Sequence, residues 1–177
     1  MEFEFPNIRH LRAFSEVSRH RGISAASAVI HLSQPAITQA ISKLETRLGV
    51  ALFERITGGM FPTEPGQLFL QRVDRMLGNL AFAAQEVARQ QGGRSSKGFA
   101  NFDRLITSAQ LRALIPVSEA RNFSIAARNI GISQPSIHRA ARDLEKLSGL
   151  TLFRTTSQGI ELTPAAEHLA RWARLAA

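Results

Sequence analysis

Residues Ser33–Glu45 read SQPAITQAISKLE and residues Ser133–Glu145 read SQPSIHRAARDLE, so one thirteen-residue pattern occurs twice at an offset of 100. The agreement extends outward on both sides of this stretch. Residues 11–63 and 111–163 align without a gap, and 21 of the 53 aligned positions are identical. A repeat of this quality indicates that one structural unit occurs twice along the chain.

The bulk composition narrows the class of protein. The chain has 177 residues, no cysteine and a formal net charge of +8. The lack of cysteine excludes disulfides and thiolate metal sites, as is typical of a reducing cytoplasm. We find no secretory signal and no apolar run long enough to span a bilayer, so we expect a cytoplasmic protein without membrane contact. The positive charge favours a polyanionic partner but does not identify one.

Apolar periodicity and capping residues predict the elements of each repeat. In the first repeat, helices are expected over residues 7–20, 25–31 and 34–48. Ser24 and Ser33 are the expected N-caps of the second and third helices, and Pro35 suits the first turn of the third. The inward-facing residues of the third helix are expected to be Ile37, Ile41, Leu44 and Leu48.

A β-hairpin is expected after the third helix, around Gly58-Gly59, and Thr63 is expected to cap the next helix. The second repeat predicts helices over residues 104–120, 124–130 and 134–147, a hairpin around Gln158-Gly159 and a helix after Thr163. This order of elements is that of a winged helix-turn-helix. The predicted fold class is therefore mainly α, with two tandem winged helix-turn-helix domains, each carrying a small β-hairpin wing, joined by a long amphipathic linker helix.

The domain boundaries follow from the repeat. We expect a first winged domain over 1–63, a linker helix over 64–91, a flexible linker over 92–102, a second winged domain over 103–163 and the start of a second linker helix over 164–177. The flexible linker contains the glycine- and serine-rich stretch GGRSSKG, Gly92–Gly98.

The linker helix carries an apolar stripe at spacings of three and four residues, over a length of about 40 Å. Such a stripe needs a partner. The partner is either the same helix of a second chain or the helix after Thr163, and we favour the second chain because the helix after Thr163 is short in this sequence. The expected dimerisation residues are Phe69, Val73, Met76, Leu77, Leu80, Ala84 and Val87.

The third helix of each unit is the expected reader of DNA, because an α-helix fits the major groove and its outer face here is polar. In the first unit this face carries Ala36, Thr38, Gln39, Ser42 and Lys43; in the second it carries Ser136, His138, Arg139, Arg142 and Asp143. Arg55 and Arg154 lie in the hairpins, where they suit phosphate or minor-groove contact. Ser33 and Ser133 start the helices, where a hydroxyl can cap the helix and also bind phosphate.

The two outer faces differ in chemistry, although the inward positions stay apolar. Gln34 or Gln39 suits adenine, whereas Arg139 and Arg142 suit guanine, and each good bidentate contact would contribute about 1–3 kcal/mol of discrimination. The alternative for the second unit is a degenerate helix-turn-helix that serves in dimerisation or protein interaction.

The run from Leu11 through Ser33–Glu45 to Gly49, Leu52-Phe53, Arg55, Gly59 and Thr63 resembles the DNA-binding domain of LysR-type transcriptional regulators. Residues Asn122–Gly149, with Leu152-Phe153 and Leu162–Ala165, resemble the same domain again. The resemblance implies a bacterial, nucleoid-associated regulator that binds double-stranded promoter DNA as a homodimer through its linker helix. The DNA contacts that it implies are Ser33, Gln34, Pro35, Ala36, Thr38, Gln39, Ser42, Lys43 and Arg55, and Ser133, Gln134, Pro135, Ser136, His138, Arg139, Arg142 and Arg154.

The chain also departs from that family pattern. Thr155 replaces the wing arginine that Arg55 supplies in the first unit, and the tandem is itself unusual, because one such domain per chain is the family's habit. Regulators of this type normally continue into an α/β effector domain, so we expect this chain to be a fragment. A small-molecule inducer is expected only if such a domain exists.

Enzymatic activity is the first rival function, and it finds no support in the pattern. The five histidines show no metal-ligand spacing, and the sequence has neither a phosphate-binding glycine loop nor a nucleophile motif. We therefore expect no catalytic residue, no metal site and no cofactor. A pure protein-interaction module is the stronger rival, and it predicts that changes in the third helices do not alter DNA binding.

Overall fold

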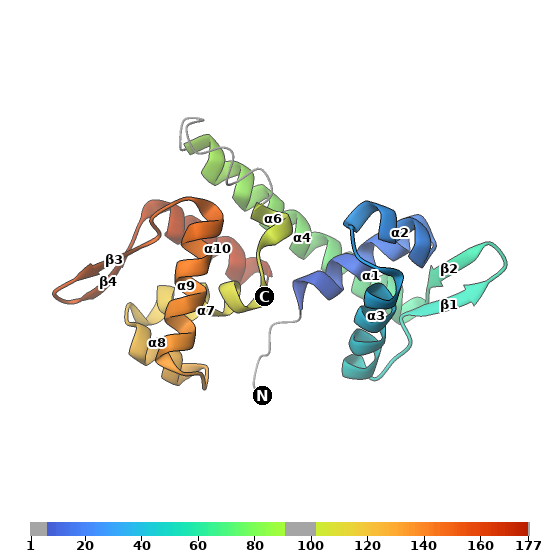
Figure 1. Cartoon of the computed structure of the whole chain (residues 1–177), viewed down its shortest axis with the longest axis horizontal. Helices are drawn as coiled ribbons and strands as arrows, with labels where there is room; N and C mark the ends of the chain where they lie inside the picture. Colours follow the sequence, from blue (N-terminus) through green and yellow to red (C-terminus); the bar gives the residue numbers. More distant parts are fainter. Residues whose placement is uncertain (1–6, 91–101, 177) are drawn as a thin grey trace. The chain divides into compact units, whose positions relative to one another are not determined.

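The computed structural model describes residues 7–90 and 102–176, which form helices and two small hairpins (Figure 1). The described residues divide into two compact units, 7–75 and 76–176. The predicted flexible linker, except for its last residue, lies outside the described residues.

The first unit has the element order predicted for a winged helix-turn-helix. Its elements are α1 (Ile8–His20), α2 (Ile23–Ile30), α3 (Gln34–Leu48), β1 (Phe53–Ile56), β2 (Gly59–Pro62) and the first part of α4 (Glu64–Gln90). The strands pair antiparallel, with Arg55 opposite Met60, and form a wing beside α3 (Figure 1).

Local capping explains where α3 begins and ends. The Ser33 hydroxyl accepts a hydrogen bond from the Ala36 backbone N–H at 3.4 Å, and Gly49 ends the helix in the left-handed conformation, both as predicted. Ser24, in contrast, is not the cap of α2, which begins one residue earlier at Ile23. Arg21 closes α1 in the left-handed conformation, so the chain enters α2 directly after Gly22. Leu48 was expected to face inward, but its side chain is 44% exposed.

The core of the first unit surrounds α1. Phe14 is fully buried, and its ring centroid lies 5.1 Å from that of Phe53 and 5.2 Å from that of Phe69. These aromatic contacts join α1 to the base of the wing and to the start of α4. Phe69, predicted as a dimerisation residue, thus packs on the core of its own unit, because the first turns of α4 continue from the wing across α1.

The second unit repeats this plan after the last part of α4. Its elements are α6 (Phe102–Leu105), α7 (Ser108–Ala120), α8 (Phe123–Asn129), α9 (Gln134–Ser148), β3 (Phe153–Thr156), β4 (Gly159–Leu162) and α10 (Pro164–Ala176). The prediction of a single helix over residues 104–120 is wrong. The helix is interrupted between Leu105, where α6 ends, and Ser108, where α7 begins. Thr107 and Gln110 form a reciprocal capping box, in which Gln110 accepts from the Thr107 N–H at 2.8 Å. The capping box therefore marks the N-terminus of α7 as a separate helix.

The last part of α4 packs against α10 inside the second unit. The Phe82 and Trp172 rings meet edge to face with centroids 5.0 Å apart, and His168 Nε2 lies 3.8 Å from a Glu86 carboxylate oxygen. The two partners left open for the apolar stripe were a second chain and the helix after Thr163, and the structure shows the latter contact. Of the predicted dimerisation residues, Val73, Met76, Leu80, Ala84 and Val87 are already buried in the single chain, and Leu77 is half-buried.

Candidate nucleic-acid interface

A carboxylate fixes the wing against the third helix in both units. In the first unit, Glu45 Oε1 accepts hydrogen bonds from the backbone N–H groups of Leu52 and Phe53, at 2.8 and 3.3 Å. Glu145 makes the same two bonds, at 2.8 and 3.0 Å, in the second unit. The carboxylate satisfies two amides where the chain enters the wing, and so holds the base of the wing on the third helix.

The other strand of the wing is fixed to the end of the first helix. The Met60 N–H donates to the Arg21 carbonyl at 3.0 Å, and the Ile160 N–H donates to the Arg121 carbonyl at 2.8 Å. This approach leaves no room beside Gly59, where a Cβ atom would lie 2.3 Å from the Arg21 carbonyl oxygen. Gly59 is identical in the two repeats for this steric reason.

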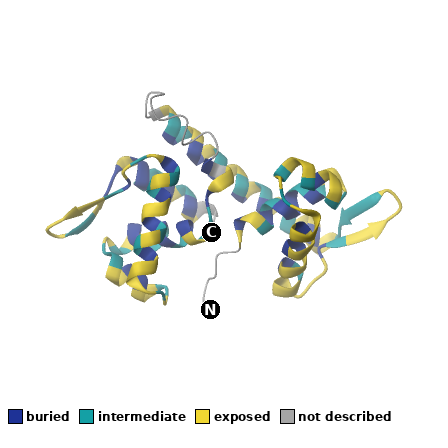
Figure 2. Cartoon of the chain, in the orientation of Figure 1, coloured by how far each residue is buried: buried dark blue, intermediate teal, exposed yellow. Residues whose placement is uncertain are grey.

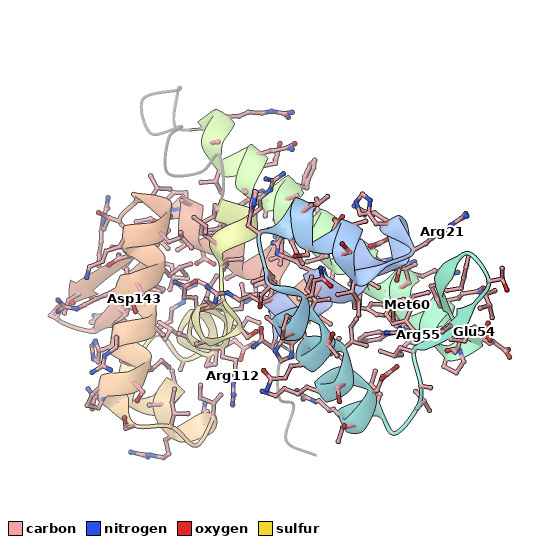
Figure 3. All side chains as sticks on the ribbon, turned by 45° about the vertical axis from the view of Figure 1, so that its right-hand side comes forward. Arg21, Glu54, Arg55, Met60, Arg112 and Asp143 are labelled. Carbon is pink, nitrogen blue, oxygen red and sulfur yellow. The ribbon has the colours of Figure 1, made fainter. Side chains whose placement is uncertain are left out.

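These fixed elements form an open groove of about 1450 Å³ between α3 and the wing of the first unit. Figure 3 shows Arg21, Arg55 and Met60 together at this wing. The groove is lined by Arg21, Gly22, Ile23, Ser27, Gln34, Pro35, Thr38, Gln39, Ser42, Lys43, Arg55, Ile56, Gly59 and Met60. Seven of the predicted DNA contacts of the first unit are in this set.

The polar side chains of α3 are exposed and available to a ligand (Figure 2). Gln39, Ser42 and Lys43 lie on the outer face, whereas Ile37 and Leu44 are buried on the inner face. Ser33 and Ala36 are exposed at the start of the helix but do not line the groove. The inward and outward division predicted for α3 therefore holds, apart from Leu48.

Arg21 and Ser27 were not predicted from the sequence as groove residues. The Arg21 guanidinium lies 5.2 Å from the centre of the Phe61 ring, which holds the charge at the wing. The identity of Arg21 with Arg121 in the repeat was a signal that could have identified this residue. No comparable signal marks Ser27, whose hydroxyl donates to the Leu32 carbonyl.

The electrostatics of the first unit include one perturbed histidine. Partial burial, followed by the nearby positive charge of Lys43, lowers the pKa of His10. Both causes disfavour the protonated imidazole. The charge of Lys43 on α3 thus affects the protonation of His10 on α1.

The second unit presents a different outer face. Ser133, Gln134, Pro135, Ser136, Arg139 and Arg142 are all exposed. His138 is half-buried, and its ring centroid lies 4.0 Å from that of Phe123 on α8. Asp143 stands where the first unit has Lys43, on the outer side of α9 (Figure 3). The face combines two exposed arginines with an imidazole that packs against Phe123 at an interplanar angle of 38°.

The wings differ in where they carry charge. Thr155 pairs with Ile160 at the register position that Arg55 and Met60 occupy in the first unit, and Arg154 pairs with Glu161. Successive strand residues point to opposite faces, so Arg154 projects from the other face of the hairpin and does not replace Arg55 geometrically.

The arginine at the end of the first helix also behaves differently in the second unit. Arg121 forms an ion pair with Glu167 on α10, whereas the Arg21 guanidinium lies against the Phe61 ring. Both arginines line the pocket at their own wing. The pocket at the second wing is smaller, about 540 Å³, and includes Glu161. Each wing carries one arginine and one glutamate, Arg55 with Glu54 in the first unit and Arg154 with Glu161 in the second, at different register positions.

Among the described residues, no group of three or more histidine, cysteine, aspartate and glutamate side chains could hold a metal ion. Within the same ranges, no helix has both the length and the apolarity needed to cross a bilayer.

Comparison with known proteins gives consistent matches to one group. The model of a family described as bacterial regulatory helix-turn-helix protein, lysR family, matches residues 8–67 and 108–167. The chain is 32% identical over 169 residues to the HTH-type transcriptional regulator GalR of Pseudomonas putida KT2440, an alignment that covers 96% of this chain and 41% of that protein. It is 31% identical over 134 residues to BudR of Klebsiella aerogenes, covering 73% of this chain and 92% of that protein.

Solved structures are also similar to part of the chain. The crystal structure of a BenM_DBD/catB site 1 DNA complex aligns with 49% of this chain and 97% of that one, at 29% identity and a TM-score of 0.46. The chain spans less than half the length of GalR and about a quarter of the length of CfxR of Cupriavidus necator.

Proposed function

Because the chain belongs to the lysR family of bacterial regulatory helix-turn-helix proteins, we propose that it is a sequence-specific regulator that binds double-stranded promoter DNA. The observation that carries the proposal is the groove between α3 and the wing, which gathers Gln39, Lys43 and Arg55 on one exposed surface. Cationic and amide side chains on a projecting helix suit phosphates and base edges. Such a protein acts in the bacterial cytoplasm, at the nucleoid.

In this arrangement α3 enters the major groove and the wing contacts the adjacent backbone. Gln39 lies on the outer face of α3, where its amide can pair with an adenine edge. Arg55 and Lys43 supply phosphate contacts, which position the protein and make its affinity depend on salt. The second unit reads DNA through Arg139 and Arg142 of α9.

Dimerisation through α4 stays a prediction. In the single chain, Leu80, Ala84 and Val87 on that helix are buried, so a second chain would have to displace what covers them. An inducer is proposed only for a longer protein with an effector domain, because α3, α9 and the wings are committed to DNA in this proposal.

The test is binding to a DNA site selected by the intact chain, measured by fluorescence anisotropy at several salt concentrations. Gln39→Ala is expected to weaken binding about 5- to 150-fold at the matching base pair, corresponding to about 1–3 kcal/mol. Lys43→Ala is expected to weaken binding to every sequence and to lower the salt slope by about one.

Gln71→Ala is the matched control, since Gln71 is an exposed glutamine on α4 outside the groove. If Gln39→Ala and Lys43→Ala bind the selected site as tightly as Gln71→Ala does, α3 does not read DNA. That result would favour a protein-interaction module instead.

A further inference from the structure

We propose that one chain reads an asymmetric DNA element made of two unlike half-sites, one bound by α3 and the other by α9. The contact of α4 with α10 within the chain takes the place of a contact between subunits. This inference rests on the proposed function, and it adds the form of the DNA target and the number of chains on it.

The first support is the contact between α4 and α10 within one chain, here called the seam. Phe82 contacts Trp172, and Glu86 lies beside His168, so residues of α4 one turn apart meet residues of α10 one turn apart. Trp172 Nε1 donates a hydrogen bond to His168 Nε2 at 3.0 Å, which joins the two contacts into one cluster. The cluster thus combines an aromatic contact with a polar one between α4 and α10.

Burial along the two helices agrees with a completed seam. On α4, Leu80, Ala83, Ala84 and Val87 are no more than 4% exposed. On α10, Ala165, Ala166, Leu169, Ala170 and Ala173 are no more than 6% exposed. Small side chains on α10 allow close approach of the helices that pack against it. Phe82 itself stays 44% exposed, but these neighbouring apolar positions are covered within the single chain.

Covalent connection favours this arrangement over pairing between chains. Two segments tethered in one polypeptide meet at an effective concentration that can reach the millimolar range for a short flexible connection. A regulator present at far lower concentration would have to exchange α10 for the same segment of another chain. We therefore expect the intrachain contact to form without a second chain.

The second support is that the two reading helices are not equivalent. A symmetric homodimer presents the same surface twice and therefore matches a palindromic site. This chain instead presents Thr38, Gln39, Ser42 and Lys43 in one unit, and His138, Arg139, Arg142 and Asp143 in the other. Because the exposed side chains differ at all four positions, the two units prefer different base edges.

The first experiment selects duplexes from a random pool with the intact chain and determines stoichiometry by native mass spectrometry. We expect one chain per duplex and a motif with two unlike halves. A palindromic site bound by two chains would overturn the inference and leave the proposed function intact. A site with a single half, unaffected by Arg139→Ala or Arg142→Ala, would also overturn it. Failure to select any DNA would refute the proposed function as well.

A variant that carries the outer-face residues of α9 on α3 tests which helix binds which half-site. Thr38→His, Gln39→Arg, Ser42→Arg and Lys43→Asp together give α3 the four side chains of α9, and all four replaced residues are exposed, so folding is preserved. We expect the α3 half of the motif to change toward the α9 half, while the α9 half stays the same. An unchanged motif would contradict the inference. Gln71→Ala is the control that leaves both halves unchanged.

The seam has its own reporter, because Trp172 is the only tryptophan in the chain. We expect Phe82→Ala to change Trp172 fluorescence at nanomolar concentration, and the wild-type emission to be the same from nanomolar to micromolar concentration. Emission that changes with concentration, together with a dimer in sedimentation, would show that the seam forms between chains and would overturn the proposal.

Discussion

Glu45 joins the wing of the first unit to its third helix, and replacing it with alanine should loosen that junction. The change removes the acceptor of the 2.8 Å bond from the Leu52 N–H and of the longer 3.3 Å bond from Phe53. Leu52 is fully buried, so its amide has little access to replacement water. An unsatisfied buried amide costs about 1–3 kcal/mol, and the longer bond adds less.

We therefore expect Glu45→Ala to lower the free energy of unfolding of the first unit by about 2 kcal/mol. With a urea dependence of about 2 kcal/mol per molar, the midpoint should fall by about 1 M. Circular dichroism follows the helices of both units, whereas Trp172 fluorescence follows the second unit only. Glu45→Ala should shift the first signal more than the second, and Glu145→Ala should shift the fluorescence midpoint.

Glu45→Gln is the matched variant, because an amide oxygen can still accept both bonds without the charge. It should lose clearly less stability than Glu45→Ala. Equal midpoints for the alanine and glutamine variants, or no shift in either, would show that the carboxylate does not hold the wing.

Two other predictions concern the first unit. Gly59→Ala should destabilise it by about 1–3 kcal/mol more than Gly58→Ala, since both residues have positive φ but only the Gly59 position meets the Arg21 carbonyl; equal urea midpoints would refute the steric argument. Because the pKa of His10 is lowered in the folded state, the unfolded chain binds the proton more readily. Stability should thus be complete above the unfolded pKa of about 6.5 and decline as the pH falls below it. His10→Asn should flatten this pH dependence of the urea midpoint, and an unchanged profile would contradict it.

Local signals were sufficient for most of the element order. Ser33 and Gly49 define α3 through hydrogen bonds and backbone conformation within a few residues of each end, so the sequence predicts both. The same reasoning failed at Ser24, because the N-cap of α2 is Gly22, which has no side chain to cap the helix and so gives no signal in the sequence. Apolar periodicity also predicted too long a helix before Thr107, because the capping box of Thr107 with Gln110 begins a new helix there.

The groove residues show where local reasoning ends. Gln39 and Lys43 follow from helical periodicity, which places them opposite the buried Ile37 and Leu44. Arg21 is distant from them in sequence and reaches the groove only because the wing strand pairs with its carbonyl. Such a long-range contact has no periodic signature.

The sequence by itself determined that one helix-turn-helix unit occurs twice, with a common apolar core and two different polar faces. Repetition is visible in the sequence itself, and periodicity and capping depend on residues close together in the chain, so none of them needs a structure to be recognised. Only the tertiary structure decided which residues of the same chain α4 contacts. Hydrophobic burial is not directional, so the stripe indicates that a partner is needed but not which one. Within the chain, Phe69 packs on the core of the first unit and Phe82 lies against Trp172 of α10, whereas pairing of α4 with a second chain stays a prediction.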